Sequence, residues 1–441
     1  MGRPSKSAIV KMVLTLAAVS AITLGTIGTG QARSARTARA SSEVNLNITY
    51  RIVSPKNDEF MKWMADTFNS RNKGKIKVTL TGIPDNDFKP KIGLVLRGSS
   101  PPDVFFAWEA GWAKFMIDSG FAAPLDSYWK QYNWTKTLTP AATNIATMEG
   151  HKYLVPYYMS ASVVWYNTDI YKKYKLSVPK TWAQMQHNAD VLKKAGVAPF
   201  LLANQQQWEA QFDWSAYFVN KYGAKTYDQL LNRQIPWTDP RVIAAFQQMK
   251  TMEDQGWFLK GVNSMDFDTT AIVFWKKQQA ANWYQGSFIL AKFLENKKLT
   301  YPVDWFPYPQ IGSQKPSMSV FAESTWMMAK RSKHKAEAAS FLNFAISREA
   351  QEKMVAGDGP FAANRTVTPE LSDEPAIVQR MGKAIAKYSG ISFTHPDHAL
   401  GPAVSQPFLE QLQGVLAGTS TPAQAAAVTE KAAQRSQGPV K

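Results

Sequence analysis

The sequence predicts an α/β protein. Residues 44–53 alternate apolar and polar side chains around Leu46 and Ile48, which is typical of a strand with one buried face. Residues 58–69 then place apolar side chains at helical spacing. The order strand, helix, strand, helix, strand is completed by residues 76–81, 88–97 and 101–106. This alternation favours a sheet that begins with parallel strands.

Later stretches continue the mixed pattern. Helices are predicted over residues 112–119, 182–195, 204–222, 240–256, 268–277, 332–351 and 408–417. Strands are predicted over residues 198–202, 279–287, 303–308 and 319–329. In parallel sheets, ligands lie at the carboxyl ends of the strands. We therefore expect residues 54–57 and 107–109 to face a cleft.

Composition limits the classes of function. The chain has 441 residues and is 45% hydrophobic, which suggests two or three domains with large cores. Its 15 Trp and 16 Tyr fill cores and also suit a site that stacks on sugar rings. There is no cysteine, which excludes disulfides, thiolate metal sites and the lipid anchor of a lipoprotein.

The net charge of +17 is spread along the chain. Residues 1–40 carry six Lys/Arg and no acid, and removing those six from +17 leaves +11 for the remainder. We find no dense basic run and no nucleic-acid-binding module, so nucleic acid is not an expected partner.

Residues 1–40 have the features of an export signal. Arg3, Lys6 and Lys11 form a basic start, and residues 12–30 are uncharged and moderately apolar. Residues 38–40, Ala-Arg-Ala, match a small-x-small cleavage site. The alternative is an uncleaved membrane anchor, which the many Gly, Thr and Ser disfavour. We expect an exported protein, periplasmic or extracellular.

The central stretch, residues 149–184, organises the chain. A turn at Glu149 and Gly150 leads into a short aromatic strand that Pro156 ends. A second strand, residues 162–166, is apolar on both faces. Asn167 is predicted to cap a short helix, and Thr181 to cap another that begins with Trp182.

This order resembles the hinge-crossing segment of extracellular solute-binding proteins of carbohydrate ABC transporters, the maltose-binding-protein-like family 1. The resemblance implies two α/β lobes of the type II periplasmic-binding-protein fold, joined by a hinge, with the ligand in the cleft between them. It implies a signal peptide at 1–40, a mostly N-terminal lobe at 41–155, and a mostly C-terminal lobe at 156–310. A hinge return with shared helices would occupy 311–433, and a polar tail 434–441.

The resemblance and the strand ends together predict the ligand-binding residues. Phe288 stands where the family usually has a tryptophan, and Glu323 stands in place of a glycine. Trp108, Tyr157, Trp283 and Phe288 would stack on sugar faces, and Glu109, Asp213, Glu323 and Asp358 would accept hydroxyl hydrogens. The full predicted set is Asn57, Trp108, Glu109, Tyr157, Trp208, Asp213, Trp283, Tyr284, Phe288, Glu323, Trp326 and Asp358.

Two other classes of function remain open. A secreted glycoside-acting enzyme also pairs aromatic rings with two carboxylates, but no spacing here marks a matched acid and base. A binding protein for another solute, such as a polyamine, is the second alternative. The five histidines are scattered, and we expect the pair His395 and His398 to be solvated rather than metal-bound.

We therefore predict a non-enzymatic protein that captures a sugar or oligosaccharide and delivers it to an ABC transporter permease. It is predicted to be a monomer with no cofactor and no metal.

Overall fold

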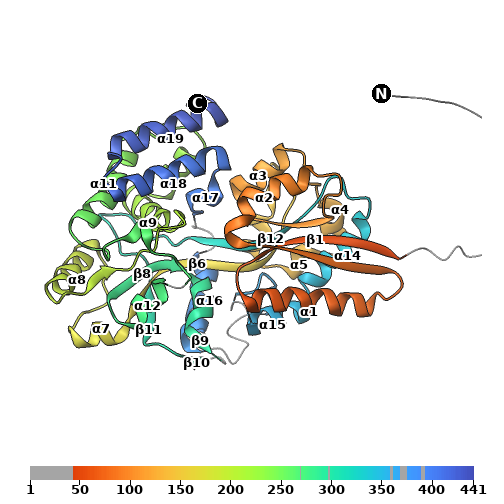
Figure 1. Cartoon of the computed structure of the whole chain (residues 1–441), viewed down its shortest axis with the longest axis horizontal. Helices are drawn as coiled ribbons and strands as arrows, with labels where there is room; N and C mark the ends of the chain where they lie inside the picture. The colour runs from red at the N-terminus through yellow and green to blue at the C-terminus, as the bar shows by residue number, and fades with distance from the viewer. Residues whose placement is uncertain (1–42, 269, 296–297, 358–360, 368–374, 389–392) are drawn as a thin grey trace, which may run out of the picture. The chain divides into compact units, whose positions relative to one another are not determined.

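In the computed structural model, the described part of the chain contains one mixed sheet of eight strands (Figure 1). The structure describes residues 43–441 apart from 269, 296–297, 358–360, 368–374 and 389–392, so the predicted export signal lies outside the described residues. The strands run in the order β2 (Ile76–Pro84), β1 (Val44–Ile52), β3 (Val104–Ala107), β12 (Val320–Met328), β6 (Val155–Asn167), β8 (Ala280–Gly286) and β7 (Ala198–Phe200). The eighth strand, β11 (Val303–Phe306), pairs with β6.

The first lobe is the part built around β1, β2 and β3. Both β2 and β3 pair with β1 in parallel, as the sequence predicts. Ser54 caps the first helix, because its Oγ accepts the N–H of Asn57 at 3.0 Å. The lobe contains α1 (Pro55–Arg71), α2 (Asp85–Arg97), α3 (Ala110–Asp118), α4 (Asp126–Gln131), α5 (Trp134–Thr137), α6 (Pro140–Ile145), α14 (Lys335–Ala345) and α15 (Arg348–Gly357).

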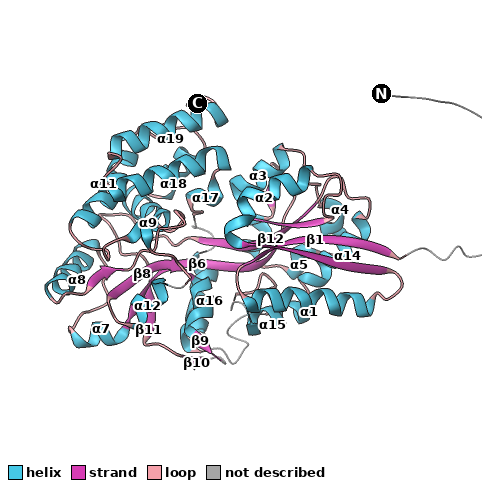
Figure 2. Ribbon diagram, in the orientation of Figure 1, coloured by secondary structure: helices cyan, strands magenta, loops and turns pink. Residues whose placement is uncertain are grey.

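The second lobe is the part built around β7, β8 and β11. The predicted caps are confirmed: Asn167 accepts the N–H groups of Asp169 and Ile170, and Thr181 forms a capping box with Gln184. Its helices are α7 (Thr168–Lys173), α8 (Trp182–Lys194), α9 (Ala210–Tyr222), α10 (Ala224–Leu231), α11 (Pro240–Asp254), α12 (Thr270–Lys276), α18 (Pro402–Ala417) and α19 (Pro422–Gln437). Figure 2 shows helices on both faces of the sheet.

Strand β6 joins the two lobes and corrects one sequence prediction. We predicted a strand that stops at Pro156 and a second strand over residues 162–166, whereas β6 is continuous. The paired strand β12 has register shifts on either side of Ser324, and the next residue, Thr325, lies opposite Pro156. Because the ladder is already irregular there, the missing N–H of Pro156 does not end the strand. The first half of β6 pairs with β12, and the second half with β8 and β11.

The predicted turn at Glu149 and Gly150 is confirmed. It connects β4 (Thr147–Met148) to β5 (His151–Lys152), which pair antiparallel. Both turn residues have positive φ, 51° and 84°, which suits a tight hairpin.

One helix prediction needs correction. The single helix predicted over residues 332–351 is two helices, α14 and α15. Ser347 begins the second one, because its Oγ accepts the N–H of Ala350 at 3.3 Å. Helix α19 continues to Gln437, so it includes the first residues of the segment 434–441 that was predicted to be a polar tail.

Shorter elements complete the described chain. They are η1 (Val262–Ser264), η2 (Ser287–Ile289), α13 (Leu290–Phe293), β9 (Leu294–Glu295), β10 (Lys298–Leu299), α16 (Ala376–Tyr388) and α17 (Pro396–Ala399). Among the described residues, no helix is both long enough and apolar enough to span a membrane.

Candidate functional site

A cavity of about 980 Å³ lies between the two lobes. Residues from α2 and α3 line it on the first-lobe side, and residues from α9 and α18 line it on the second-lobe side. Its aromatic residues are Trp108, Trp112, Phe115, Tyr158, Trp208, Phe212, Phe267 and Phe288. Its charged residues are Arg51, Lys56, Asp85, Lys89, Arg97, Asp268, Lys292, Glu323 and Asp397. The cavity therefore combines apolar rings with charges of both signs.

The carboxyl ends of the three parallel strands meet at this cavity. Residues 53–56 follow β1, Asp85 follows β2, and Trp108 follows β3, and all of them line it. This is the edge at which parallel sheets hold their ligands. The predicted location of residues 54–57 and 107–109 at a cleft is right for residues 54–56 and for Trp108.

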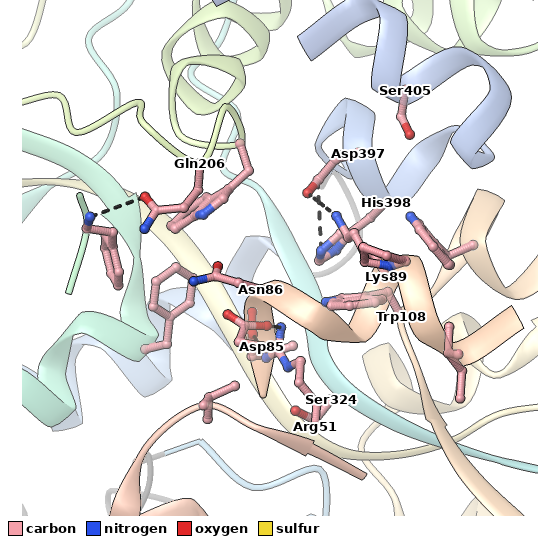
Figure 3. Close-up of a pocket in the computed structure, with 18 of the residues that line it drawn as sticks. Arg51, Asp85, Asn86, Lys89, Trp108, Gln206, Ser324, Asp397, His398 and Ser405 are labelled. Atoms are coloured by element: carbon pink, nitrogen blue, oxygen red, sulfur yellow. Dashed lines mark hydrogen bonds and ion pairs between the residues drawn. The ribbon is translucent and has the colours of Figure 1, made fainter. Parts of the chain in front are cut away.

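A network of ion pairs lines the first-lobe side (Figure 3). The guanidinium of Arg51 lies 2.5 Å from a carboxylate oxygen of Glu323 and 3.3 Å from one of Asp85. The ammonium of Lys89 lies 3.1 Å from Oδ2 of Asp397. In these three pairs, neighbouring carboxylates balance the positive charges of Arg51 and Lys89.

Trp108 lies between these two cations. The Arg51 guanidinium is 5.0 Å and the Lys89 ammonium 4.9 Å from the centroid of its ring. Both distances are in the range of a cation–π interaction. The indole is only 3% exposed, so it holds the charged network in place and presents little of its surface to the cavity.

Burial and neighbouring charges separate the protonation states of three cavity groups. Burial raises the pKa of Glu323 to about 7, even though the Arg51 cation acts in the opposite direction. Burial would also raise the pKa of Asp397, but the Lys89 ammonium and His398 outweigh it and lower the pKa to about 2. Burial, together with the nearby cations, lowers the pKa of His398 to about 4. At neutral pH, Asp397 is therefore ionised and His398 is neutral.

The second-lobe side is lined by an aromatic cluster. The ring of Trp208 lies 5.0 Å from that of Phe267, 5.7 Å from Phe212 and 6.3 Å from Phe288, all edge to face. Trp208 and Phe288 are only partly buried, so their surfaces remain open to the cavity.

Four of the predicted ligand-binding residues line the cavity: Trp108, Trp208, Phe288 and Glu323. Glu323 enters as expected from its place in β12, where it pairs with Arg51. Asp358 lies outside the described residues.

The other seven predicted residues lie outside the cavity lining, and their contacts explain why. Asn57 accepts the N–H of Val53 at 3.4 Å, next to the cap of α1. Glu109 accepts the N–H of Ala322 at 2.8 Å and the hydroxyl of Thr394 at 2.9 Å. Asp213, on α9, is 1% exposed.

The four remaining residues are aromatic and belong to the two cores. Tyr157 stacks on Trp326 with ring centroids 5.1 Å apart. Trp283 donates its indole N–H to Glu209 at 3.3 Å, and Tyr284 packs edge to face on Tyr308. Neighbours in a strand point to opposite faces, so nearness to a strand end did not tell us which side chain reaches the cleft.

The sequence analysis missed most of the charged lining. Asp85 follows a parallel strand, so the rule that selected residues 54–57 also applied to it. No feature of the sequence indicated that Arg51, Lys89 or Asp397 would line the cavity. The expectation that His395 and His398 are solvated is wrong: their exposed fractions are 0% and 7%.

Metal binding finds no support in the described residues, where no group of three His, Cys, Asp or Glu side chains is arranged to hold an ion.

Residues 54–352 match the family of bacterial extracellular solute-binding proteins. The chain is 24% identical over 379 residues to the alpha-glucosides-binding periplasmic protein AglE of Rhizobium meliloti, with 80% of each chain covered. It is 23% identical over 308 residues to the sn-glycerol-3-phosphate-binding periplasmic protein UgpB of Shigella flexneri, covering 65% of this chain and 67% of UgpB.

The fold is shared with a solved structure from work on xylan utilization by Caldanaerobius polysaccharolyticus. The TM-score is 0.79 at 20% identity, and the match covers 88% of this chain and 99% of that one. The strand order and the cavity between the two lobes are consistent with the family match over residues 54–352. The chain therefore belongs to the bacterial extracellular solute-binding protein family.

Proposed function

We propose that this protein captures a neutral carbohydrate in the cavity between its lobes and delivers it to the permease of an ABC transporter. The observation that carries the proposal is the lining of the cavity, in which an open aromatic cluster faces a network of paired charges. Aromatic rings suit the apolar faces of a sugar, and a few well-placed polar groups suit its hydroxyls. The similarity to AglE, whose name states that it binds alpha-glucosides, supports this class of ligand.

Trp208 and Phe288 are the proposed stacking residues. Both belong to the cluster on the second-lobe side and are only partly buried. Trp108 was predicted to stack, but Arg51 and Lys89 both lie over its ring. We assign Trp108 the role of positioning those two cations for contact with the ligand.

Closure around the ligand would be a hinge motion of the two lobes. The strand β6 passes from one lobe to the other, and the ligand would favour the closed state by binding it more tightly. We also propose that the protein is an exported monomer without a lipid anchor and that it has no catalytic role. An anionic solute is a second candidate ligand, because the name of the similar protein UgpB states that it binds sn-glycerol 3-phosphate.

A thermal-shift screen tests the proposal. The purified protein is heated with glucose, galactose, maltotriose, xylotriose, chitotriose and, separately, sn-glycerol 3-phosphate. A ligand present at a hundred times its Kd adds about 2.7 kcal/mol to the free energy of unfolding. We expect a shift with at least one sugar, and none with the phosphate.

The recovered ligand separates binding from hydrolysis. A sugar that shifts the melting temperature and is recovered intact supports the transport role. A cleaved sugar would favour the glycoside-acting enzyme, and a shift with the phosphate alone would overturn the neutral-carbohydrate assignment.

A further inference from the structure

Asp397, His398 and Trp112 line the cavity, and each carries a buried polar atom that has no hydrogen-bond partner among the described residues. These atoms are Oδ1 of Asp397, Nδ1 of His398 and the indole N–H of Trp112. The three residues are between 3% and 7% exposed. An unpaired polar group at such burial costs free energy, so each of these atoms calls for a partner that the cavity admits.

The ammonium of Lys89 connects these residues. It lies 3.1 Å from Oδ2 of Asp397 and 5.6 Å from the centroid of the Trp112 ring. In Figure 3, dashed lines join the carboxylate of Asp397 to Lys89 and to His398. Nε2 of His398 lies 3.8 Å from Oδ1 of Asp397, which is beyond hydrogen-bonding distance.

The backbone that carries Asp397 and His398 is held by both lobes. Gln211, on α9 of the second lobe, accepts the N–H of Asp397 at 2.7 Å. On the first-lobe side, α17 lies so close to Gly111 that a Cβ there would come within 2.4 Å of the carbonyl oxygen of Ala399. The segment is therefore fixed before any ligand arrives, which reduces the entropy lost on binding.

We propose that Asp397, His398 and Trp112 form a subsite that reads two neighbouring hydroxyls of a neutral sugar. Oδ1 of Asp397 accepts the hydrogen of one hydroxyl, while the Trp112 indole N–H donates to the oxygen of a hydroxyl. Nδ1 of His398 completes the contact with the second hydroxyl. This inference rests on the proposed carbohydrate-binding function and names the residues that select the ligand.

The charge of the subsite also selects the ligand. Lys89 and Asp397 form an ion pair with no net charge, and His398 is neutral at neutral pH. A phosphate or carboxylate placed there would add an unbalanced negative charge at a buried position, whereas a neutral polyol would not. The subsite therefore favours a neutral polyol over an anionic solute.

The test uses the sugar that binds best among maltotriose, xylotriose and chitotriose, with affinity measured by calorimetry. Asp397→Asn removes the charge of the acceptor, and we expect roughly 10- to 100-fold weaker binding, as for a hydrogen bond to a charged group. His398→Ala and Trp112→Phe remove one neutral partner each, and we expect roughly 3- to 10-fold losses. His398→Asn retains a polar group near the position of Nδ1 and should restore part of the affinity.

Monodeoxy analogues of the same sugar identify the contact directly. For the analogue that lacks the hydroxyl read by Asp397, the wild-type protein should already bind weakly, and Asp397→Asn should weaken binding less than twofold further. Glu430→Gln serves as the control. It breaks a buried ion pair with Arg233 at 2.7 Å, outside the cavity, so it lowers stability and leaves the affinity within about twofold.

The outcomes separate this inference from the proposed function. If none of the sugars binds the wild-type protein, the carbohydrate-binding function fails, and the subsite fails with it. If a sugar binds but folded Asp397→Asn and His398→Ala both keep its affinity within twofold, the subsite alone is overturned. In that case, water rather than ligand satisfies these three atoms.

Discussion

The ammonium of Lys89 pairs with the carboxylate of Asp397 at 3.1 Å, joining α2 of the first lobe to the short helix α17. The Asp397 side chain is 6% exposed and that of Lys89 is 33% exposed. The pair therefore neutralises a carboxylate that would otherwise stand alone in a buried position.

We predict that Lys89→Met destabilises the protein by about 2 kcal/mol. Removing one partner of a buried pair leaves an uncompensated charge, and the partial exposure of Lys89 moderates the cost. Chemical denaturation of the variant measures it. Lys91→Met is the matched control, because Lys91 lies on the same helix in an exposed pair with Asp87 and should cost less than about 0.5 kcal/mol. Equal costs for the two variants would contradict the prediction.

We predict that Trp208→Ala weakens sugar binding about tenfold. The partly exposed ring of Trp208 belongs to the aromatic cluster on the second-lobe side, and a stacked aromatic contact is worth on the order of 1 kcal/mol beyond the area it buries. Calorimetry with the best-binding sugar measures the loss. Trp63→Ala makes the same substitution on α1, outside the cavity, and should leave the affinity unchanged. If both variants bind normally, Trp208 has no stacking role.

We predict that Glu109→Gln gains stability relative to the wild-type protein as the pH rises. Burial raises the pKa of Glu109 from 4.5 to about 7. A carboxyl whose folded-state pKa is raised contributes stability that is present below pH 4.5 and is lost as the pH rises through 7. Glutamine resembles the protonated acid and does not titrate. The difference in the free energy of unfolding between Glu109→Gln and the wild-type protein should therefore grow to on the order of 3 kcal/mol by pH 8.

The measurement is the free energy of unfolding of both proteins between pH 4.5 and 8. Burial lowers the pKa of His395 to about 3 and that of His398 to about 4, so their contributions rise with pH over part of the same range. Taking the difference between variant and wild type removes this shared background. A constant difference for Glu109→Gln would show that Glu109 does not titrate in this range.

We predict that two glycine-to-alanine substitutions have opposite effects. At Gly111, the new Cβ would meet the backbone of Ala399 and Leu400 at 2.4 to 2.6 Å, so α17 must move, and we expect a loss of about 1 to 3 kcal/mol. At Gly93, inside α2, the Cβ meets only the side chain of Arg97 at 3.5 Å, so alanine should add about 0.5 to 1 kcal/mol. Thermal denaturation distinguishes the two signs. A gain for both would contradict the close approach of α17 to α3, and a loss for both would contradict the stabilisation expected at Gly93.

Much of the fold was predictable because its signals are local. The parallel start of the sheet, the caps at Asn167 and Thr181 and the turn at Glu149 each depend on residues close together in the chain. The order of motifs around residues 149–184 also led to the correct family. The continuity of β6 was missed, because it depends on the register of β12, a strand more than a hundred residues away.

The sequence by itself determined the fold class, the family and the strand ends at which the cavity lies. Only the tertiary structure decided which side chains line it. Trp283 and Tyr157 are residue types that suit a sugar-binding site, but they face the cores. Arg51, Lys89 and Asp397 come from three separate segments of the chain and line the same cavity. The physical reason is that a binding site is defined by distances between residues far apart in the chain, and neither spacing nor composition encodes which face of a packed element a side chain occupies.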